Sequence, residues 1–302
     1  MRIALILLTG LVVWAFSTSK QKQGFTFTKN DEGVLLTENG RPVFFYQKEN
    51  RSSDGKHYFS NYIHPLFSLE GDTLTEEFPA DHKHHRGIFW AWHQHYIDDK
   101  SLGDGWIMQD ITYNVERVAT EVVNGNAVMK TRVLWTSEKW QDGKPYIEEN
   151  TTITVHPSGK DKRIIDFKIT LKALTKDISI GGSNDQKGYG GFSMRIKMPD
   201  GLTFTSEKGK ITPQLNQVEA GPWMDFSAPF GKYGDVSGIT LICDKSDPHY
   251  PQPWILRQKN SMQNIVFPGR EKFHIPEEKP VILKYRLIIH KGDSKKVEKL
   301  IN

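Results

Sequence analysis

The sequence contains a single cysteine, Cys243, among 302 residues. One thiol excludes an internal disulfide, so the fold has to be held by an ordinary hydrophobic core, which a chain of this length can bury. Cys243 ends the apolar run 238–243, and we expect its thiol to be buried and unreactive. Stability is therefore expected to come from packing.

Blocks of like charge are missing as well. Lys and Arg number 40 against 36 Asp and Glu, which gives a formal net charge of +4. Because no basic stretch stands out, composition gives no reason to expect a nucleic acid or an anionic membrane as a partner. The expected partner is a small molecule or an oligosaccharide. The 8 Trp, 10 Tyr and 16 Phe supply rings that stack on sugars, although most aromatic residues in any protein fill its core.

Long apolar runs are missing after the first residues. Residues 3–16 are apolar except for Thr9 and Gly10, and small residues follow them. This run is shorter than the roughly 20 residues that a membrane-spanning helix needs. We therefore expect residues 1–19 to be a secretory signal and residues 20–302 to form one domain, secreted or periplasmic, with no stable membrane span after cleavage. An uncleaved anchor is the alternative.

Helical periodicity is nearly absent, and alternation with a period of two replaces it. The pattern is clearest over residues 163–173, where apolar side chains alternate with polar and charged ones. Similar segments, separated by turn-forming residues, occur at residues 127–135, 146–156 and 281–290. We expect an all-β chain in which two large antiparallel sheets stack as a β-sandwich. A short C-terminal helix is expected over residues 293–301, with Asp293 or Ser294 as its N-cap.

Histidines are concentrated in one stretch of the chain. Seven of the 11 lie between His57 and His95, and the densest part, residues 79–95, reads PADHKHHRGIFWAWHQH. If residues 86–95 form one strand, successive side chains point to opposite faces. One face would carry His85, Gly87, Phe89, Ala91, His93 and His95, and the other His84, Arg86, Ile88, Trp90 and Trp92.

The first face raises the question of a metal ion. His93 and His95, at positions i and i+2, would present two nitrogens to one ion. Their spacing fixes no third ligand, which would have to be His64 or His85, and an ordinary pair of hydrogen-bonded histidines is the alternative. We expect no obligatory metal or other cofactor; a divalent ion, if one binds, is expected at His93 and His95.

The second face combines His84 and Arg86 with two tryptophans. Such a set can hold an anionic or hydroxyl-rich ligand against an aromatic wall, with an imidazole in reach for proton transfer. The alternative is an arginine stem packed on tryptophan in a structural role. His64, kept extended by Pro65, is either a pocket wall or a core residue. Trp106 adds a further aromatic ring after a glycine-containing turn.

Two further segments complete the expected site. Residues 184–195 contain three glycines between Lys187 and Arg195, so their backbone can approach a ligand closely, although a glycine-bulged strand would look the same. Residues 247–257 form a proline-stiffened loop that leads to Trp254 and Arg257. We expect both segments to converge with the histidine-rich strand on one concave sheet face.

Four motifs carry a family resemblance over most of the chain. Residues 81–87 (DHKHHRG), residues 185–195, Trp223 with Asp225, and residues 247–257 together resemble the DUF6807 family. Members also carry the label "methane oxygenase PmoA", but a membrane copper monooxygenase subunit needs several spanning helices, and this sequence shows none after residue 19. The resemblance implies a bacterial protein and, by itself, no chemistry.

The closing segment carries a second resemblance. Residues 273–277 (FHIPE) and the strand expected at 281–290 are similar to the end of galactose-mutarotase-like β-supersandwich proteins. That fold hosts epimerases and the sheet domains of many glycan lyases and hydrolases, so the analogy favours a carbohydrate ligand without naming a reaction. The paired catalytic histidine and acidic residue of the mutarotases have no identified counterpart here, and simple aldose epimerisation is not expected.

The sequence thus predicts an exported carbohydrate-active enzyme, a lyase or hydrolase that acts on a glycoside or modified sugar. His84, His85 and His64 are the candidate acid/base residues. The expected oxygen or carboxylate binders are Arg86, Lys187, Arg195 and Arg257, and the expected stacking surfaces are Trp92, Trp106 and Trp254. A cationic cluster suits a lyase, whereas a hydrolase needs two carboxylates that the sequence does not tie to the cluster. A non-catalytic glycan-binding protein and a metal-dependent enzyme are the alternatives.

Overall fold

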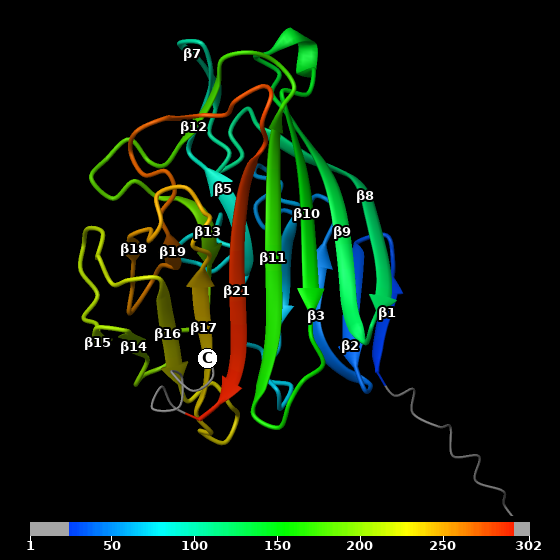
Figure 1. The fold of residues 1–302 in the computed structure, drawn as a ribbon, viewed down its shortest axis with the longest axis vertical. Coiled ribbons are helices and arrows are strands. Elements are labelled where there is room, and N and C mark those ends of the chain that lie inside the picture. Colours follow the sequence, from blue (N-terminus) through cyan, green and yellow to red (C-terminus); the bar gives the residue numbers. More distant parts are fainter. Residues whose placement is uncertain (1–23, 293–302) are drawn as a thin grey trace, which may run out of the picture.

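The computed structural model describes residues 24–292, which fold into three antiparallel sheets (Figure 1). The predicted signal segment and the predicted helix over residues 293–301 lie outside the described residues. A 3-10 turn at Gln141–Gly143 is the one helical element within them. No helix in residues 24–292 has the length and apolar character needed to cross a membrane.

The first sheet has eight strands and carries the histidine-rich segment. In spatial order it consists of β1 (Phe25–Lys29), β2 (Gly33–Glu38), β3 (Arg41–Gln47), β4 (Tyr62–Leu66), β5 (Ile88–Trp92), β13 (Gly190–Met194), β19 (Gln263–Ile265) and β18 (Trp254–Ile255).

The second sheet has nine longer strands. In spatial order they are β15 (Gly209–Lys210), β14 (Thr203–Ser206), β16 (Trp223–Ala228), β17 (Ser237–Cys243), β21 (Val281–Lys291), β11 (Lys162–Ala173), β10 (Ile147–Val155), β9 (Asn126–Thr136) and β8 (Thr112–Val123). A small third sheet contains β20 (Phe273–His274), β12 (Ile178–Gly181), β6 (Gln94–Ile97) and β7 (Lys100–Gly103).

The predicted all-β sandwich is confirmed. β11 alternates as expected, with Ile165, Phe167 and Ile169 buried and Lys168 exposed on the opposite face. The buried side chains of the nine-stranded sheet pack against those of the eight-stranded sheet. Rings meet across this interface, with centroids of Trp90 and Phe167 6.2 Å apart and those of Trp92 and Trp135 5.5 Å apart. The galactose-mutarotase-like topology stays a resemblance.

A carboxylate lies in the middle of this core. Glu149, on β10, is fully buried and accepts hydrogen bonds from the indole N–H groups of Trp90 (2.8 Å) and Trp135 (3.1 Å). The Asn61 amide (3.1 Å to each oxygen) and the Thr151 hydroxyl (2.8 Å) also donate to it. Burial raises the pKa of Glu149 above its ordinary value, and these hydrogen bonds oppose that shift. Donors from both large sheets therefore converge on one side chain.

Cys243, at the end of β17, is buried as predicted. Only 3% of the residue is exposed, and its Sγ donates to the carbonyl oxygen of Pro222 at 3.1 Å. Burial raises the pKa of the thiol to about 11. Because the thiolate is the reactive form, both accessibility and ionisation disfavour attack on a reagent.

The buried carboxylate gives a first prediction. Replacing Glu149 with Gln places an amide N–H₂ against the indole N–H groups, so one donor loses its acceptor. We expect the free energy of unfolding to fall by about 1–3 kcal/mol in urea denaturation. The control is Glu148→Gln, because Glu148 points outward and pairs with Arg132 at the surface; a loss below about 1 kcal/mol is expected there. Equal losses in the two variants would contradict the central role of Glu149.

The thiol gives a second prediction. We expect a thiol reagent at pH 8 to label native Cys243 at least ~100-fold more slowly than the urea-unfolded chain, because folding both buries the sulfur and suppresses its ionisation. Mass spectrometry of timed samples measures both rates. Labelling of the native protein at the unfolded rate would show that the C-terminal end of β17 opens freely.

Candidate functional site

The strand predicted for residues 86–95 is interrupted twice. Gly87 has a φ of +42°, and a Cβ there would collide with the carbonyl oxygen of Ile63. A second break at His93 separates β5 from β6. The predicted alternation of side chains holds along β5 but is wrong for Arg86 and for the residues after His93, because each break changes the direction of the residues beyond it.

Arg86 shows the consequence of the first break. Its guanidinium lies between the rings of Phe59 and Phe89, 4.3 and 4.2 Å from their centroids, and not beside the tryptophans of β5. Nη1 donates to the carbonyl oxygens of His84 (3.0 Å) and Trp106 (3.4 Å). Burial lowers the pKa of Arg86 to about 10, and no carboxylate pairs with it within residues 24–292. Arg86 thus fixes two loop carbonyls instead of binding a ligand as predicted.

Three imidazole rings gather beside it. The rings of His82 and His85 are stacked with centroids 4.5 Å apart, and His84 meets His85 edge-on at 4.6 Å. We call these three rings the imidazole group. His82 and His84 are partly exposed, whereas His85 is buried. No hydrogen bond reaches the His84 ring from the part of the chain that the structure describes.

Arg195 ties this group to the neighbouring strand. It follows β13 directly, and its side chain, 4% exposed, donates from Nη1 and Nη2 to the two oxygens of Asp81 at 2.9 Å each. Nε binds Glu76 at 2.9 Å, and Nη1 also reaches Nδ1 of His85 (3.4 Å) and the Ser261 carbonyl (2.6 Å). Burial opposes ionisation of Asp81, but Arg195 and His82 prevail and lower its pKa to about 2. Both positive and negative charge are thus fixed beside the imidazoles.

Two of these imidazoles, His84 and His85, are held neutral. Burial, followed by the charges of Arg86 and His82, lowers the pKa of His84 to about 4. Burial and the neighbouring His84, His82 and Arg195 lower the pKa of His85 to about 2. Both rings are therefore proton acceptors at neutral pH, and neither is charged.

An aromatic row extends from this group. His93 binds Asp104 through Nδ1 at 2.8 Å and stacks on Trp106, with centroids 5.0 Å apart. Trp106 contacts Tyr189 at 5.7 Å, and the guanidinium of Arg257 lies 5.6 Å from the Tyr189 centroid. The glycine-rich segment and the proline-stiffened loop thereby meet the histidine-rich segment, and β5, β13, β19 and β18 are consecutive strands of one sheet. That convergence was predicted.

Two of the predicted stacking surfaces are core residues. Trp92 and Trp254 are 0% exposed, and their indole nitrogens donate to the carbonyls of Phe267 and Gly221. Both rings point into the sandwich, so neither can stack on a ligand. Trp106 is also buried, at 2% exposure, and it packs against the rings of Phe89, His93 and Tyr189.

His64 and Lys187 also lie apart from the imidazole group. Nδ1 of His64 is 3.0 Å from the Thr75 hydroxyl, and burial with the charges of Arg51 and Lys197 lowers its pKa to about 4. Lys187 lies in a turn that the Asp185 carboxylate organises through the Lys187 N–H (2.9 Å).

His93 and His95 do not share a face. His95 is 0% exposed, with Nδ1 2.9 Å from the Tyr146 hydroxyl and Nε2 3.1 Å from the Trp92 carbonyl oxygen. The expected two-nitrogen arrangement is therefore wrong, because the break at His93 turns the next residues into the core. Within residues 24–292 no group of three or more His, Cys, Asp or Glu is placed to hold a metal ion.

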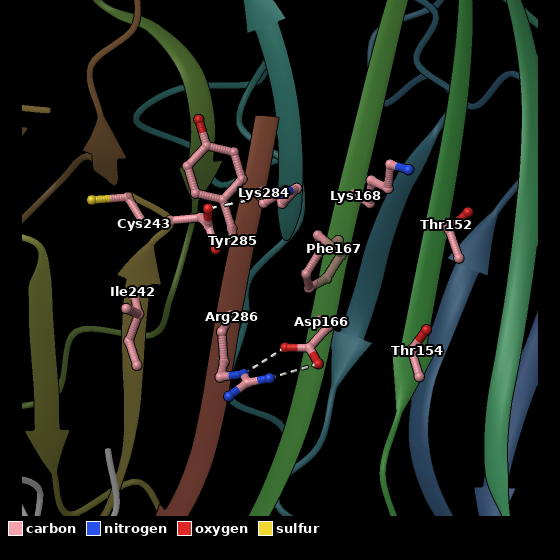
Figure 2. A pocket seen from close by; sticks show the side chains of 11 residues that line it. Thr152, Thr154, Asp166, Phe167, Lys168, Ile242, Cys243, Lys284, Tyr285 and Arg286 are labelled. Atoms are coloured by element: carbon pink, nitrogen blue, oxygen red, sulfur yellow. Dashed lines mark hydrogen bonds and ion pairs between the residues drawn. The ribbon is translucent and has the colours of Figure 1, made fainter. Parts of the chain in front are cut away.

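A separate groove of about 500 Å³ lies on the outer face of the nine-stranded sheet, and sequence reasoning missed it (Figure 2). Figure 2 shows the Asp166–Arg286 ion pair across it, with Nε to Oδ1 at 2.6 Å. Thr152 and Thr154 of β10 line its other side. The alternating pattern does show which residues of these strands face outward. It does not show where the outer face of a sheet forms a groove.

Sequence reasoning does not single out His82, Asp104 and Tyr189 as site residues, and it does not tie Glu76 to the cluster. His82 lies within residues 79–95, Asp104 lies two residues before Trp106, and Tyr189 lies among the glycines. Glu76 is far from Arg195 in the sequence, so their ion pair can be recognised only once the fold brings the two chain segments together.

The depressed imidazole pKa values give a third prediction. His64, His84 and His95 have pKa values of about 4 and His85 of about 2, below the ordinary 6.5. Between pH 6.5 and 4 the unfolded chain therefore binds more protons than the folded chain does. The free energy of unfolding should fall as the pH drops through this range. Urea denaturation at several pH values measures this.

Asp247 changes the pH dependence of stability in the opposite direction, and its replacement supplies the control. Burial raises its pKa to about 7, so its contribution to stability grows as the pH falls below 7. Asp247→Asn removes that term, and the loss of stability on acidification should become steeper. A flat profile in both proteins would rule out neutral buried imidazoles.

Comparisons with known proteins add a family assignment. A family model described as "Family of unknown function (DUF6807)" matches residues 33–302 of the 302-residue chain. A search of the curated proteins found no match. Because the family model spans far more than half of the sequence, the chain belongs to the DUF6807 family.

Proposed function

We propose that the protein is an exported carbohydrate-active lyase that abstracts a proton from an acidic or oxidised sugar. The observation that supports this most directly is His84, a partly exposed neutral imidazole whose ring has no hydrogen-bond partner within the described residues. With a pKa of about 4 the ring is unprotonated across the whole neutral range, so it is available as a weak general base.

Charge at the same face favours elimination over hydrolysis. A glycosidase needs a protonated carboxylic acid near the scissile bond, with a pKa that its surroundings raise. Asp81 and Glu76 are both bound to Arg195, and the pKa of Asp81 lies at about 2. Asp81 therefore stays ionised at neutral pH and cannot serve as that acid, and Glu76 is held in an ion pair by Arg195.

Arg257 and Tyr189 supply the remaining groups that a lyase needs. Arg257 is partly exposed, and its guanidinium donates to the carbonyls of Gln214 and Leu215 without a carboxylate partner in residues 24–292. Its uncompensated charge suits the carboxylate of a uronate and the negative charge that develops when the α-proton leaves. Burial raises the pKa of Tyr189, against the charge of Arg257, so its hydroxyl stays protonated and can donate to the departing oxygen.

The proposed reaction is balanced as a β-elimination. His84 takes the proton from the carbon beside the carboxyl group, a carbon–carbon double bond forms, and the bond to the leaving sugar oxygen breaks. Tyr189 gives its proton to that oxygen, and the cycle closes when His84 releases its proton to solvent and Tyr189 recovers one from solvent. This chemistry needs no metal or other cofactor.

Turnover assays test this proposal. The mature protein is incubated with a panel of uronates and oxidised glycosides, and the ultraviolet absorbance of an unsaturated product is followed. We expect His84→Gln to lower kcat/KM by about 10²–10⁴-fold. The matched control is His274→Gln, since His274 is exposed on β20 and its loss should leave kcat/KM unchanged.

The pH profile separates a catalytic base from a structural histidine. With a pKa of about 4, His84 should sustain kcat/KM down to pH 5, where an ordinary imidazole is mostly protonated. Elemental analysis of tag-free protein before and after chelation tests the absence of a metal requirement. Activity lost with a near-stoichiometric metal would replace this mechanism with a metal-dependent one.

A non-catalytic glycan-binding function is the second candidate. The groove in Figure 2 favours it, because threonine hydroxyls and charged side chains line an open sheet face there. If glycans of the panel bind but are never turned over, and His84→Gln leaves their affinity intact, the binding function stands and the lyase does not.

A further inference from the structure

A second polar cavity lies at the opposite end of the strands from the β11–β12 connection. The β2–β3 turn and the β10–β11 turn meet the end of β21 there, at the lower end of the molecule in Figure 1. The cavity has a volume of about 420 Å³. Its lining is Glu38, Asn39, Arg41, Leu69, Ser158, Gly159, Lys160, Arg163 and Lys291.

Positive charge dominates this cavity. Four of the lining side chains are cations and one, Glu38, is a carboxylate. Glu38 is already engaged by Arg163 (3.2 Å) and by the backbone N–H of Ser158 (2.7 Å). Glu70 neutralises Lys291 from outside the lining, at 2.5 Å. Arg41 and Lys160 have no ion pair within residues 24–292, so an excess of positive charge faces the cavity.

Arg163 is the buried and structurally fixed cation of this cavity. It is 3% exposed, and Nη2 and Nε both point at Oε2 of Glu38 (3.2 and 3.4 Å). Its Nη1 is buried without any hydrogen-bond partner. Buried donors are nearly always satisfied, so an orphaned guanidinium nitrogen beside a polar cavity indicates an acceptor that the chain itself does not supply.

We propose that this cavity binds a tetrahedral oxyanion, a phosphate or sulfate group, either free or as the ester of a small sugar. Two guanidinium and two ammonium groups around one space are the groups that recognise such anions, through charge-assisted hydrogen bonds. The anion lies against the guanidinium of Arg163 at the cavity wall, while Arg41 and Lys160 neutralise its charge. The volume exceeds that of one ion, so the rest of an ester fits beside it.

This site is independent of the imidazole group. Its residues come from the β2–β3 turn, the β10–β11 turn and the ends of β11 and β21, whereas the imidazole group precedes β5. The proposal therefore does not rest on the lyase function.

Binding of inorganic phosphate and sulfate to the mature protein tests the proposal. Isothermal titration and thermal melting are carried out at constant ionic strength, with chloride as the reference anion. We expect saturable binding of both oxyanions and a rise in Tm that chloride does not produce. Arg41→Gln/Lys160→Gln should weaken binding at least tenfold, and because both side chains are exposed, the variant should fold.

The control is Lys168→Gln/Lys284→Gln, which removes two lysines from the groove of Figure 2 and should leave phosphate affinity unchanged. Arg163→Lys keeps the positive charge but removes the planar set of guanidinium donors. It should weaken phosphate and sulfate binding while the ion pair with Glu38 is retained. A monosaccharide sulfate that binds at least tenfold more tightly than inorganic sulfate would identify an ester as the ligand, and equal affinities would identify the free anion. Oxyanions that act no differently from chloride, or that bind equally well to the Arg41/Lys160 variant, would overturn the proposal.

Discussion

The carboxylate of Glu149 is the constraint on which the rest of the sandwich depends. A buried anion is expensive unless donors surround it, so the chain must bring Trp90 and Asn61 from the eight-stranded side to Trp135 and Thr151 on the other. This requirement fixes Trp90 inward. Because side chains alternate along β5, Phe89 is then fixed outward, and it becomes the surface on which Arg86 and Trp106 pack. The candidate site is thus positioned from the core.

Two guanidinium groups then set the electrostatics of that outer surface in different ways. Arg195 is neutralised by Asp81 and Glu76, and it acts mainly as a linker between β13 and the histidine-rich loop. Arg86 has aromatic rings instead of carboxylates around it, so its charge acts on its surroundings without compensation. Its field adds to burial in keeping His84 unprotonated.

The sequence allowed the sandwich to be predicted because long strands with one buried face carry a clear period of two, as β11 does. The same rule places Glu149 and its donor Thr151 on the apolar face of β10, although the other three donors come from other chain segments that periodicity cannot identify. β5 differs, since all five of its residues are buried. A strand covered on both faces gives no sign of which face points into the sandwich, so Trp92 is predicted on a surface although Trp90 and Trp92 both lie in the core. Gly87 and the break at His93 then displaced Arg86 and His95 from their predicted faces.

The covering segments explain why the candidate site lies on the eight-stranded sheet. Loops laid over a sheet carry backbone carbonyls that need donors once they are buried. Arg86 donates to those of His84 and Trp106, and Arg195 donates to that of Ser261. The loops are therefore held in place by Nη1 of Arg86 and by Arg195, whose Nε, Nη1 and Nη2 are all engaged, while Nε of Arg86 is buried without a partner. The partly exposed groups nearest to a ligand are those at the edge of these loops, the ring of His84 and the guanidinium of Arg257.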